Sequence, residues 1–357
     1  MAKEKIHELP QTKGIFQVSG IVSGVKKEKF YTEKETKTGK QFRSVNFGIE
    51  YEPGKTIYIS LNGMPRDNVY LSKKEDKKTV TKKVAWKDRM KEDPDGYSLI
   101  GVRLGLTKDA DGKNEKVILT EYDACKYINE NLEDGMSVFI KGNLEYSSFI
   151  NNNGEKTRST KFIPTQISLF RNPIDFDADD FKSQHDFQQT IVFSSIEKEM
   201  NDDKPTGRFI IEANIVNYNS IEIAEFVTNS TKLATNMRKK LKPYNAIQIF
   251  GKIDAVNNIE EVEETYEDDW GDGDEKDAIN EQRVSGSSRR ELRANGVHVD
   301  TLDKESYTEN AINAAIKKAT ASKKAEENFA AKSTESKNDE SDWGDEDDGF
   351  DDSDEPW

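Results

Sequence analysis

The 357 residues hold 53 Lys and Arg against 68 Asp and Glu, which gives a formal charge of −15. Two acidic blocks exceed this total: residues 260–277 carry −10 and residues 338–357 carry −11. The remaining chain is therefore basic, and residues 1–171, with 31 bases and 24 acids, carry +7. That is the sign that a domain needs to bind a polyanion.

Composition excludes several classes of protein. No apolar run approaches the roughly 18 residues that cross a bilayer, and the first residues are charged where a secretory signal is apolar. We expect a soluble, cytoplasmic protein with no membrane partner. Cys125 is the single cysteine, which rules out an intrachain disulfide, and three scattered histidines offer no zinc site. No metal and no cofactor are expected.

Residues 13–171 read as short strands rich in Val, Ile and aromatic residues, separated by Gly, Asn and Asp turns. Phe42–Tyr51 and Thr56–Gly63 alternate, which predicts one buried face lined by Val45, Phe47, Ile49, Ile57, Ile59 and Leu61. A strand, the turn Asn151–Gly154 and a returning strand follow near the end of this segment. There we expect Val138, Ile140, Leu144, Ile163 and Ile167 to point inward.

A short helix at Asp123–Glu133 precedes that hairpin. The order strand, strand, strand, helix, strand, strand is that of the five-stranded Greek-key OB barrel. Residues 64–96 do not fit a minimal barrel, because they are long, basic and weakly patterned. They are predicted to form an inserted arm or extended hairpin.

After an acidic linker at 172–186, the strand pattern restarts, and residues 187–266 repeat the order of the first barrel. The candidate for the fifth strand is Ile259–Tyr266. Residues 267–337 are expected to be a spacer with a helix at about 308–329, beginning at the capping-box spacing of Ser306 and Glu309. The acidic tail, 338–357, cannot bury enough apolar surface and should be disordered. The fold class is thus mainly β: two OB barrels, a helical spacer and a disordered acidic tail.

Single strands are bound by cations that track the phosphates and by aromatic rings on which bases stack. The first domain offers both on its expected outer face, which in OB barrels is the face of strands 2 and 3 with the neighbouring loops. The candidate nucleic-acid-binding residues are Phe30, Tyr31, Lys34, Lys37, Lys40, Phe42, Arg43, Tyr58, Lys82, Lys83, Trp86, Phe139, Lys141, Phe149, Lys156, Arg158 and Phe162.

Each of these residues also has a plain structural interpretation. An outward ring is often covered by a loop, and Trp86 would then anchor the arm to the barrel. The lysines of the arm would be an ordinary solvated surface. A register slip of one residue would turn Phe42 and Tyr58 inward. The second barrel carries only +1 over residues 187–259, so a weaker binder or a structural partner is expected there.

The acidic tail ends in an apolar ring. Together with the barrel pattern of Gly14–Phe170, this resembles single-stranded DNA-binding proteins of bacteria and their phages, in which an OB domain precedes an acidic tail with a hydrophobic tip. The second barrel, the spacer with its helix and the terminal Trp in place of Phe depart from the bacterial pattern, and two barrels in one chain are more similar to a phage version.

The resemblance implies a sequence-tolerant single-stranded DNA-binding protein, active in replication, recombination or repair. It also implies that the tail binds replication or recombination proteins of polymerase, helicase or primase type and competes with DNA for the groove. The tail residues concerned are Asp351, Asp352, Asp354, Glu355, Pro356 and Trp357. In a phage-encoded protein the location would be the cytoplasm of the bacterial host. Homo-oligomerisation stays open.

Two other functions remain as alternatives. A metal-dependent nuclease would need carboxylates fixed on rigid elements, whereas 11 of the 31 acids from Glu260 onward lie in the tail, and no nucleotide-binding or hydrolase motif is present. We therefore expect no enzyme. An acidic DNA mimic or scaffold that does not bind nucleic acid would give the net charge a direct role. RNA as the ligand is a smaller variation, since only the resemblance favours DNA.

Overall fold

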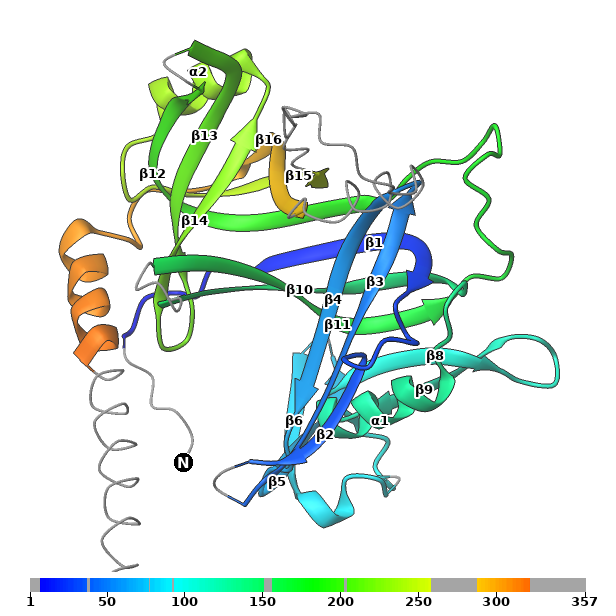
Figure 1. Cartoon of the computed structure of the whole chain (residues 1–357). Helices are drawn as coiled ribbons and strands as arrows, with labels where there is room; N and C mark the ends of the chain where they lie inside the picture. Colours follow the sequence, from blue (N-terminus) through cyan, green and yellow to red (C-terminus); the bar gives the residue numbers. More distant parts are fainter. Residues whose placement is uncertain are drawn as a thin grey trace, which may run out of the picture.

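The structure is a computed structural model that describes residues 7–36, 39–76, 78–91, 93–150, 156–201, 204–257 and 288–321. It is mainly β, with two barrels lying one above the other in Figure 1. The helices of the described part are α1, α2 and a segment at 309–321. No described helix is long and apolar enough to cross a membrane.

The first barrel closes through five strands, each paired with two others. β1 pairs with β3 and β10, β3 pairs with β4, β10 pairs with β11, and β4 meets β11 in parallel at Ile59 and Phe162. With α1 between the third and fourth strands, this is the predicted OB topology. The bounds are β1 Gly14–Ser23, β3 Gln41–Glu52, β4 Lys55–Gly63, α1 Glu121–Asn131, β10 Ser137–Ile150 and β11 Lys156–Leu169.

The interior of this barrel follows the alternation of β3 and β4. The six residues predicted to line it are at most 2% exposed: Val45, Phe47, Ile49, Ile57, Ile59 and Leu61. α1 closes one end of the barrel. Its first turn is capped by the Thr120 side chain, which accepts a hydrogen bond from the backbone N–H of Asp123.

Strand β11 exchanges its inner and outer faces partway along its length. β10 keeps a regular alternation, but its register with β11 shifts between the pairs Lys141–Gln166 and Gly142–Pro164, so that Thr165 is an extra residue on β11. Such a bulge moves every residue beyond it to the other face. Phe162 is therefore buried, where the sequence predicts it outside, and Ile163 is only half-buried, where the sequence predicts it inside.

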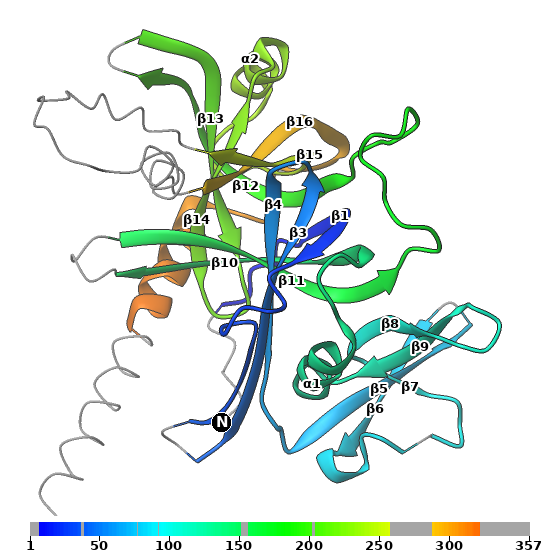
Figure 2. The same cartoon turned by 45° about the vertical axis from the view of Figure 1, so that its right-hand side comes forward.

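The inserted arm forms a small sheet of its own. β5 (Asn68–Glu75) pairs with β6 (Lys78–Ala85) and with β7 (Ser98–Leu99), and we call these three strands the arm sheet. A short 3-10 turn, Trp86–Asp88, follows β6. Figure 2 shows the arm sheet beside a second hairpin, β8 (Val102–Lys108) and β9 (Asn114–Leu119), at the end of the molecule far from the second barrel.

The second barrel repeats the topology of the first. β12 pairs with β13 and β15, β13 with β14, β15 with β16, and β14 meets β16 in parallel at Val227 and Arg293. A helix again lies between the third and fourth strands. The bounds are β12 His185–Asn201, β13 Lys204–Val216, β14 Ile221–Thr228, α2 Thr231–Lys240, β15 Ala246–Asn257 and β16 Ser288–Asp303.

The fifth strand of this barrel differs from the expected one. It is β16, which the sequence assigns to the spacer, while the expected Ile259–Tyr266 lies outside the described residues. The second barrel therefore extends to Asp303 rather than ending at residue 266. The helical segment 309–321 packs Ile312 and Ala315 against Leu9, Val192, Val216, Ala246 and Tyr307.

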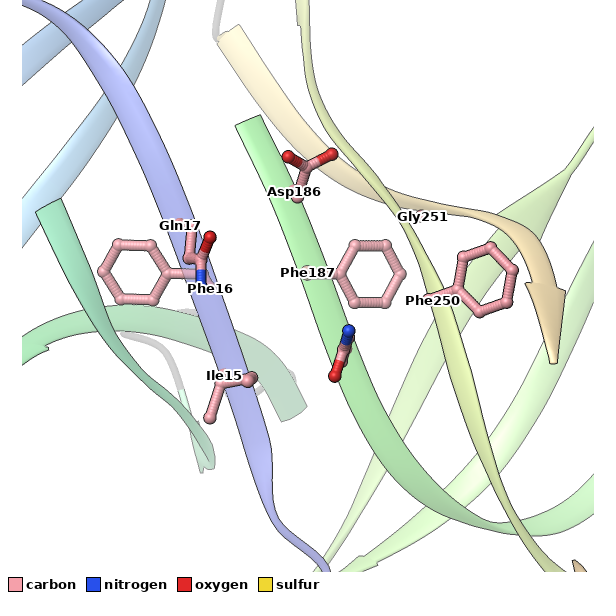
Figure 3. A pocket seen from close by; sticks show the side chains of 8 residues that line it. Ile15, Phe16, Gln17, Asp186, Phe187, Phe250 and Gly251 are labelled. Carbon is pink, nitrogen blue, oxygen red and sulfur yellow. The ribbon is translucent and has the colours of Figure 1, made fainter. Parts of the chain in front are cut away.

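The barrels are joined by direct strand pairing. Residues Gly14–Val18 of β1 pair with His185–Gln189 of β12, so the two barrels share a continuous sheet. Figure 3 shows Phe16 and Phe187, which are register partners here, with their rings turned away from each other. Phe16 packs edge-on against Phe162 in the first barrel, and Phe187 stacks on Phe226 in the second. A hollow of about 230 Å³ remains at this joint.

The bulge at Thr165 generates a stability prediction. Phe162→Ala should lower the free energy of unfolding by about 3–5 kcal/mol, because it removes a buried ring and leaves a cavity beside Phe16. Lys161→Ala, one residue away and exposed, should change it by less than about 0.5 kcal/mol. Urea unfolding followed by circular dichroism measures both. Equal effects would show that β11 carries no bulge.

The single cysteine provides a second check. Cys125 of α1 is fully buried, and burial raises the pKa of its thiol to about 12. Because the thiolate is the reactive species, we expect no labelling by a thiol reagent at pH 8 in the native protein and complete labelling in denaturant. Rapid labelling of the native protein would contradict the placement of α1 against the barrel.

Candidate nucleic-acid interface

The outer face of β3 and β4 is polar and uncharged at its centre. Ser44 lies opposite Asn62, and Asn46 lies opposite Ser60, in the antiparallel register. Both asparagines are exposed and both serines are half-buried. Amide and hydroxyl groups donate and accept hydrogen bonds, so this centre can pair with base edges of any kind. We call this face, with the two rings at its ends, the platform.

The two rings are Phe42 and Tyr58, and neither is sealed in the interior. Tyr58 is 50% exposed and Phe42 is half-buried. Each already carries a cation: the Lys34 ammonium lies 5.6 Å from the Phe42 ring centre, and the Arg290 guanidinium of β16 lies 4.2 Å from that of Tyr58. A ring beside a cation offers a base and a phosphate their two preferred contacts at one place.

The strand before the platform is more structural than its sequence suggests. β2 (Tyr31–Glu35) pairs with β3, and Glu33 binds Arg43 at 2.8 Å. The Arg43 guanidinium also lies 4.0 Å from the ring centre of Tyr122. Burial and the hydrogen bond that Tyr31 donates to Glu33 raise the tyrosine pKa to about 12. These groups hold the edge of the barrel.

Phe30 is wrongly placed by the sequence. It is 4% exposed and packs edge-on against Phe47, so it belongs to the core rather than to a binding loop. The chain turns just before β2, and the backbone N–H of Asn46 donates to the carbonyl of Phe30, which holds this residue against the barrel end. Phe162 is buried for the separate reason of the bulge, so neither ring is available to a base.

The arm residues divide into anchors and free cations. Trp86 packs against Tyr122 with the Arg89 guanidinium 4.3 Å from its ring centre, and Arg89 in turn binds Asp123 of α1. Trp86 is thus an anchor of the arm, as the plain structural interpretation predicts. Lys82 binds Asp93 at 2.7 Å. Lys83 is exposed, and none of the ion pairs found in the described ranges includes it.

The hairpin of β10 and β11 carries three more candidates. Phe139 and Lys141 are half-buried on the outer face of β10. Arg158 forms an ion pair with Glu225 of β14, across a hollow of about 310 Å³ between the barrels that Arg290 also lines. Exposed pairs of this kind contribute little stability, so a phosphate can replace Glu225 as the partner of Arg158.

The remaining candidates have less structural context. Lys40 is exposed at the turn between β2 and β3, where its backbone N–H donates to the Thr36 hydroxyl. Outside the described part of the chain lie Lys37, the side chains of Phe149 and Lys156, and the tail residues Asp351, Asp352, Asp354, Glu355, Pro356 and Trp357.

The second barrel offers no comparable surface in its described residues. Arg208, on the strand that corresponds to β3, binds Glu199 at 3.3 Å and also binds Glu291. Two carboxylates therefore surround the charge of this guanidinium. Among the described residues no group of three or more His, Cys, Asp and Glu is arranged to hold a metal ion.

Arg290 is a platform residue that sequence reasoning misses. It follows the acidic block 260–277 by more than ten residues and reaches the first barrel only because β16 closes the second. Burial lowers its pKa from the ordinary arginine value, because the charged guanidinium loses hydration there. No local pattern in the sequence marks this residue.

Comparison with known proteins finds a matching family model and a set of similar solved structures. A family model described as YorF matches residues 72–332. The solved structures include the wild-type single-stranded DNA binding protein from Thermus aquaticus, at 10% identity and a TM-score of 0.37, covering 81% of this chain and 93% of that one. A deletion mutant of the same protein, which also carries one substitution, matches at 11% identity and 0.37, covering 81% and 94%. A search of curated proteins finds no match.

Proposed function

The chain belongs to the YorF family, and we propose that it binds single-stranded DNA, with little dependence on sequence, on the platform of its first barrel. The observation that supports this most directly is the platform itself: a polar, uncharged centre with a cation-bearing ring at each end. A site for single strands of any sequence needs ring faces for the bases and cations for the phosphates. It does not need hydrogen bonds that distinguish one base from another.

Charge around the platform supports the same function. Lys34 and Lys40 lie on or beside β2, and none of the ion pairs within the described ranges engages either one. Residues 1–171 carry +7 although the whole chain is acidic. A basic domain within an acidic chain attracts a polyanion locally while the rest of the chain limits non-specific association. We propose that the chain acts by binding rather than by catalysis.

Ring truncation tests the platform. Tyr58→Ala and Phe42→Ala should each weaken binding of an oligothymidylate by about 1–3 kcal/mol, or roughly 5- to 150-fold, because each removes one stacking surface. Tyr218→Ala is the matched control, since Tyr218 is 45% exposed in the second barrel. Fluorescence anisotropy at graded salt measures all three.

Two results would overturn the platform. If the wild-type protein fails to bind DNA at about 0.1 M salt, the acidic DNA mimic becomes the better interpretation of the charge. If Tyr218→Ala weakens binding as much as the platform variants do, the site is elsewhere. An RNA of the same length serves as a second probe and decides whether the ligand is DNA in particular.

We further propose that the tail, 338–357, occupies the platform cations when DNA is absent and recruits replication or recombination proteins when it is displaced. Its −11 charge is tethered to the barrels, so its effective concentration near them is high. A chain ending at Asn338 should bind oligonucleotide more tightly at low salt, and the gain should vanish at high salt. A full-length variant with neutral amides in place of the tail acids is the length-matched control. Unchanged affinity in both would exclude the competition.

A further inference from the structure

A second surface of the first barrel, outside the platform, combines cations and exposed apolar groups. It begins on the three strands β10, β11 and β8. Lys141 pairs in register with Gln166, and Gln166 pairs with Arg103, so these three residues form one row across the strands. Arg103 is exposed, and Lys141 is half-buried.

The arm sheet supplies a second row. Lys83 lies opposite Tyr70, and the backbone N–H of Ile100 donates to the carbonyl of Tyr70 on the other edge of β5. Tyr70 and Ile100 are each 53% exposed, and Lys83 is exposed as well. This row therefore places an aromatic ring, an aliphatic side chain and a cation side by side in water.

The first row and Ile100 of the second row line one hollow of about 300 Å³. It is lined by Ser72, Leu99, Ile100, Gly101, Arg103, Lys141, Thr165 and Gln166. The lining contains two cations and no carboxylate. Neither Arg103 nor Lys141 belongs to any ion pair found in the described part of the chain, in contrast to Arg43, Lys82 and Arg158. We call the two rows with this hollow the arm surface.

The arm surface is also close to the platform. Two strands lie in succession beside β11. It pairs with β4 at Phe162 and, further along, with β8 from Gln166 to Ser168. The outer residues of β11 therefore lead from the edge of the platform directly to the row of Lys141 and Arg103.

We propose that the arm surface is a second contact segment for the same single strand, in which Lys141, Arg103 and Lys83 hold phosphates and Tyr70 stacks on a base. This deepens the proposed function and rests on it. Charge complementarity commits the surface to a polyanion, and the exposed ring next to the cations favours one with planar bases over an acidic peptide.

Length dependence separates the two segments. In the full chain, Arg103→Ala combined with Lys141→Ala should leave binding of an oligothymidylate of about 8 nucleotides unchanged. Binding of one of about 30 nucleotides should weaken roughly tenfold or more at about 50 mM salt, with the slope of log K against log salt reduced by about 1.4. Lys239→Ala combined with Lys240→Ala, two exposed lysines of α2, is the matched control and should change neither.

Photocrosslinking locates the contact. An oligonucleotide of about 30 nucleotides containing 5-iodouracil should crosslink to Tyr70, identified by mass spectrometry, and the crosslink should be lost with the oligonucleotide of about 8. An unchanged salt slope in the Arg103 and Lys141 variant, or no crosslink at Tyr70, would overturn the arm surface while platform binding persists. A peptide of residues 338–357 provides a further test. If the double variant no longer binds this peptide but binds the long oligonucleotide as the wild type does, the arm surface is not a DNA contact. Failure of the wild type to bind either length would instead refute the platform.

Discussion

Strand β1 determines how the whole molecule is assembled, because it hydrogen-bonds to three other strands. One edge pairs with β10, while the other pairs first with β12 and then, from Ile21 onward, with β3. The change of partner occurs beside Gly20, where an added Cβ would lie 2.2 Å from the carbonyl oxygen of Glu50. Only a residue without a side chain allows the strands to approach so closely. The first barrel and its joint with the second barrel therefore depend on this one strand.

The consequence for function is a fixed geometry between the barrels. Residues 172–186 read as an acidic linker, but the barrels do not rely on it for their relative position. Tyr51 of β3 stacks on His185 of β12, and its hydroxyl accepts a hydrogen bond from the backbone N–H of Ala255. Arg290 of the second barrel can thus be a dependable part of a platform built on the first. A platform shared in this way is preorganised rather than assembled on binding.

Much of the fold follows from alternation in the sequence. The inward residues of β3 and β4 and the strand order of each barrel are predictable, because short strands with one buried face repeat every second residue. The two wrong rings show where this reasoning fails. Phe162 lies beyond a bulge at Thr165, and Phe30 lies in a turn, and neither feature has a period to detect. The fifth strand of the second barrel is misplaced because a long acidic segment separates it from the fourth.

The site is less predictable than the fold, because a cation is available to a ligand only if no carboxylate of the protein already binds it. Arg43, Lys82 and Arg158 look equivalent to Lys83 and Lys141 in the sequence, yet the first three are bound by carboxylates. Two of these, Glu33 and Asp93, lie within the same part of the fold as their partners, and the third, Glu225, lies in the other barrel. Tyr70 is within reach of sequence reasoning, since β5 alternates between buried Val69 and Leu71 and an exposed ring. Arg103 is not, because only the pairing of β8 with β11 brings it beside Lys141.

The position of β16 also affects how the protein is made. Translation delivers the first barrel as a complete set of strands by Leu169, so that barrel can close while the ribosome is still at work. The second must wait until Asp303 has emerged, and meanwhile β14 and β15 present two bare edges of the kind that invite association with other nascent chains. The acidic block 260–277 lies between β15 and β16, and its charge of −10 opposes the close approach of another copy of the same chain.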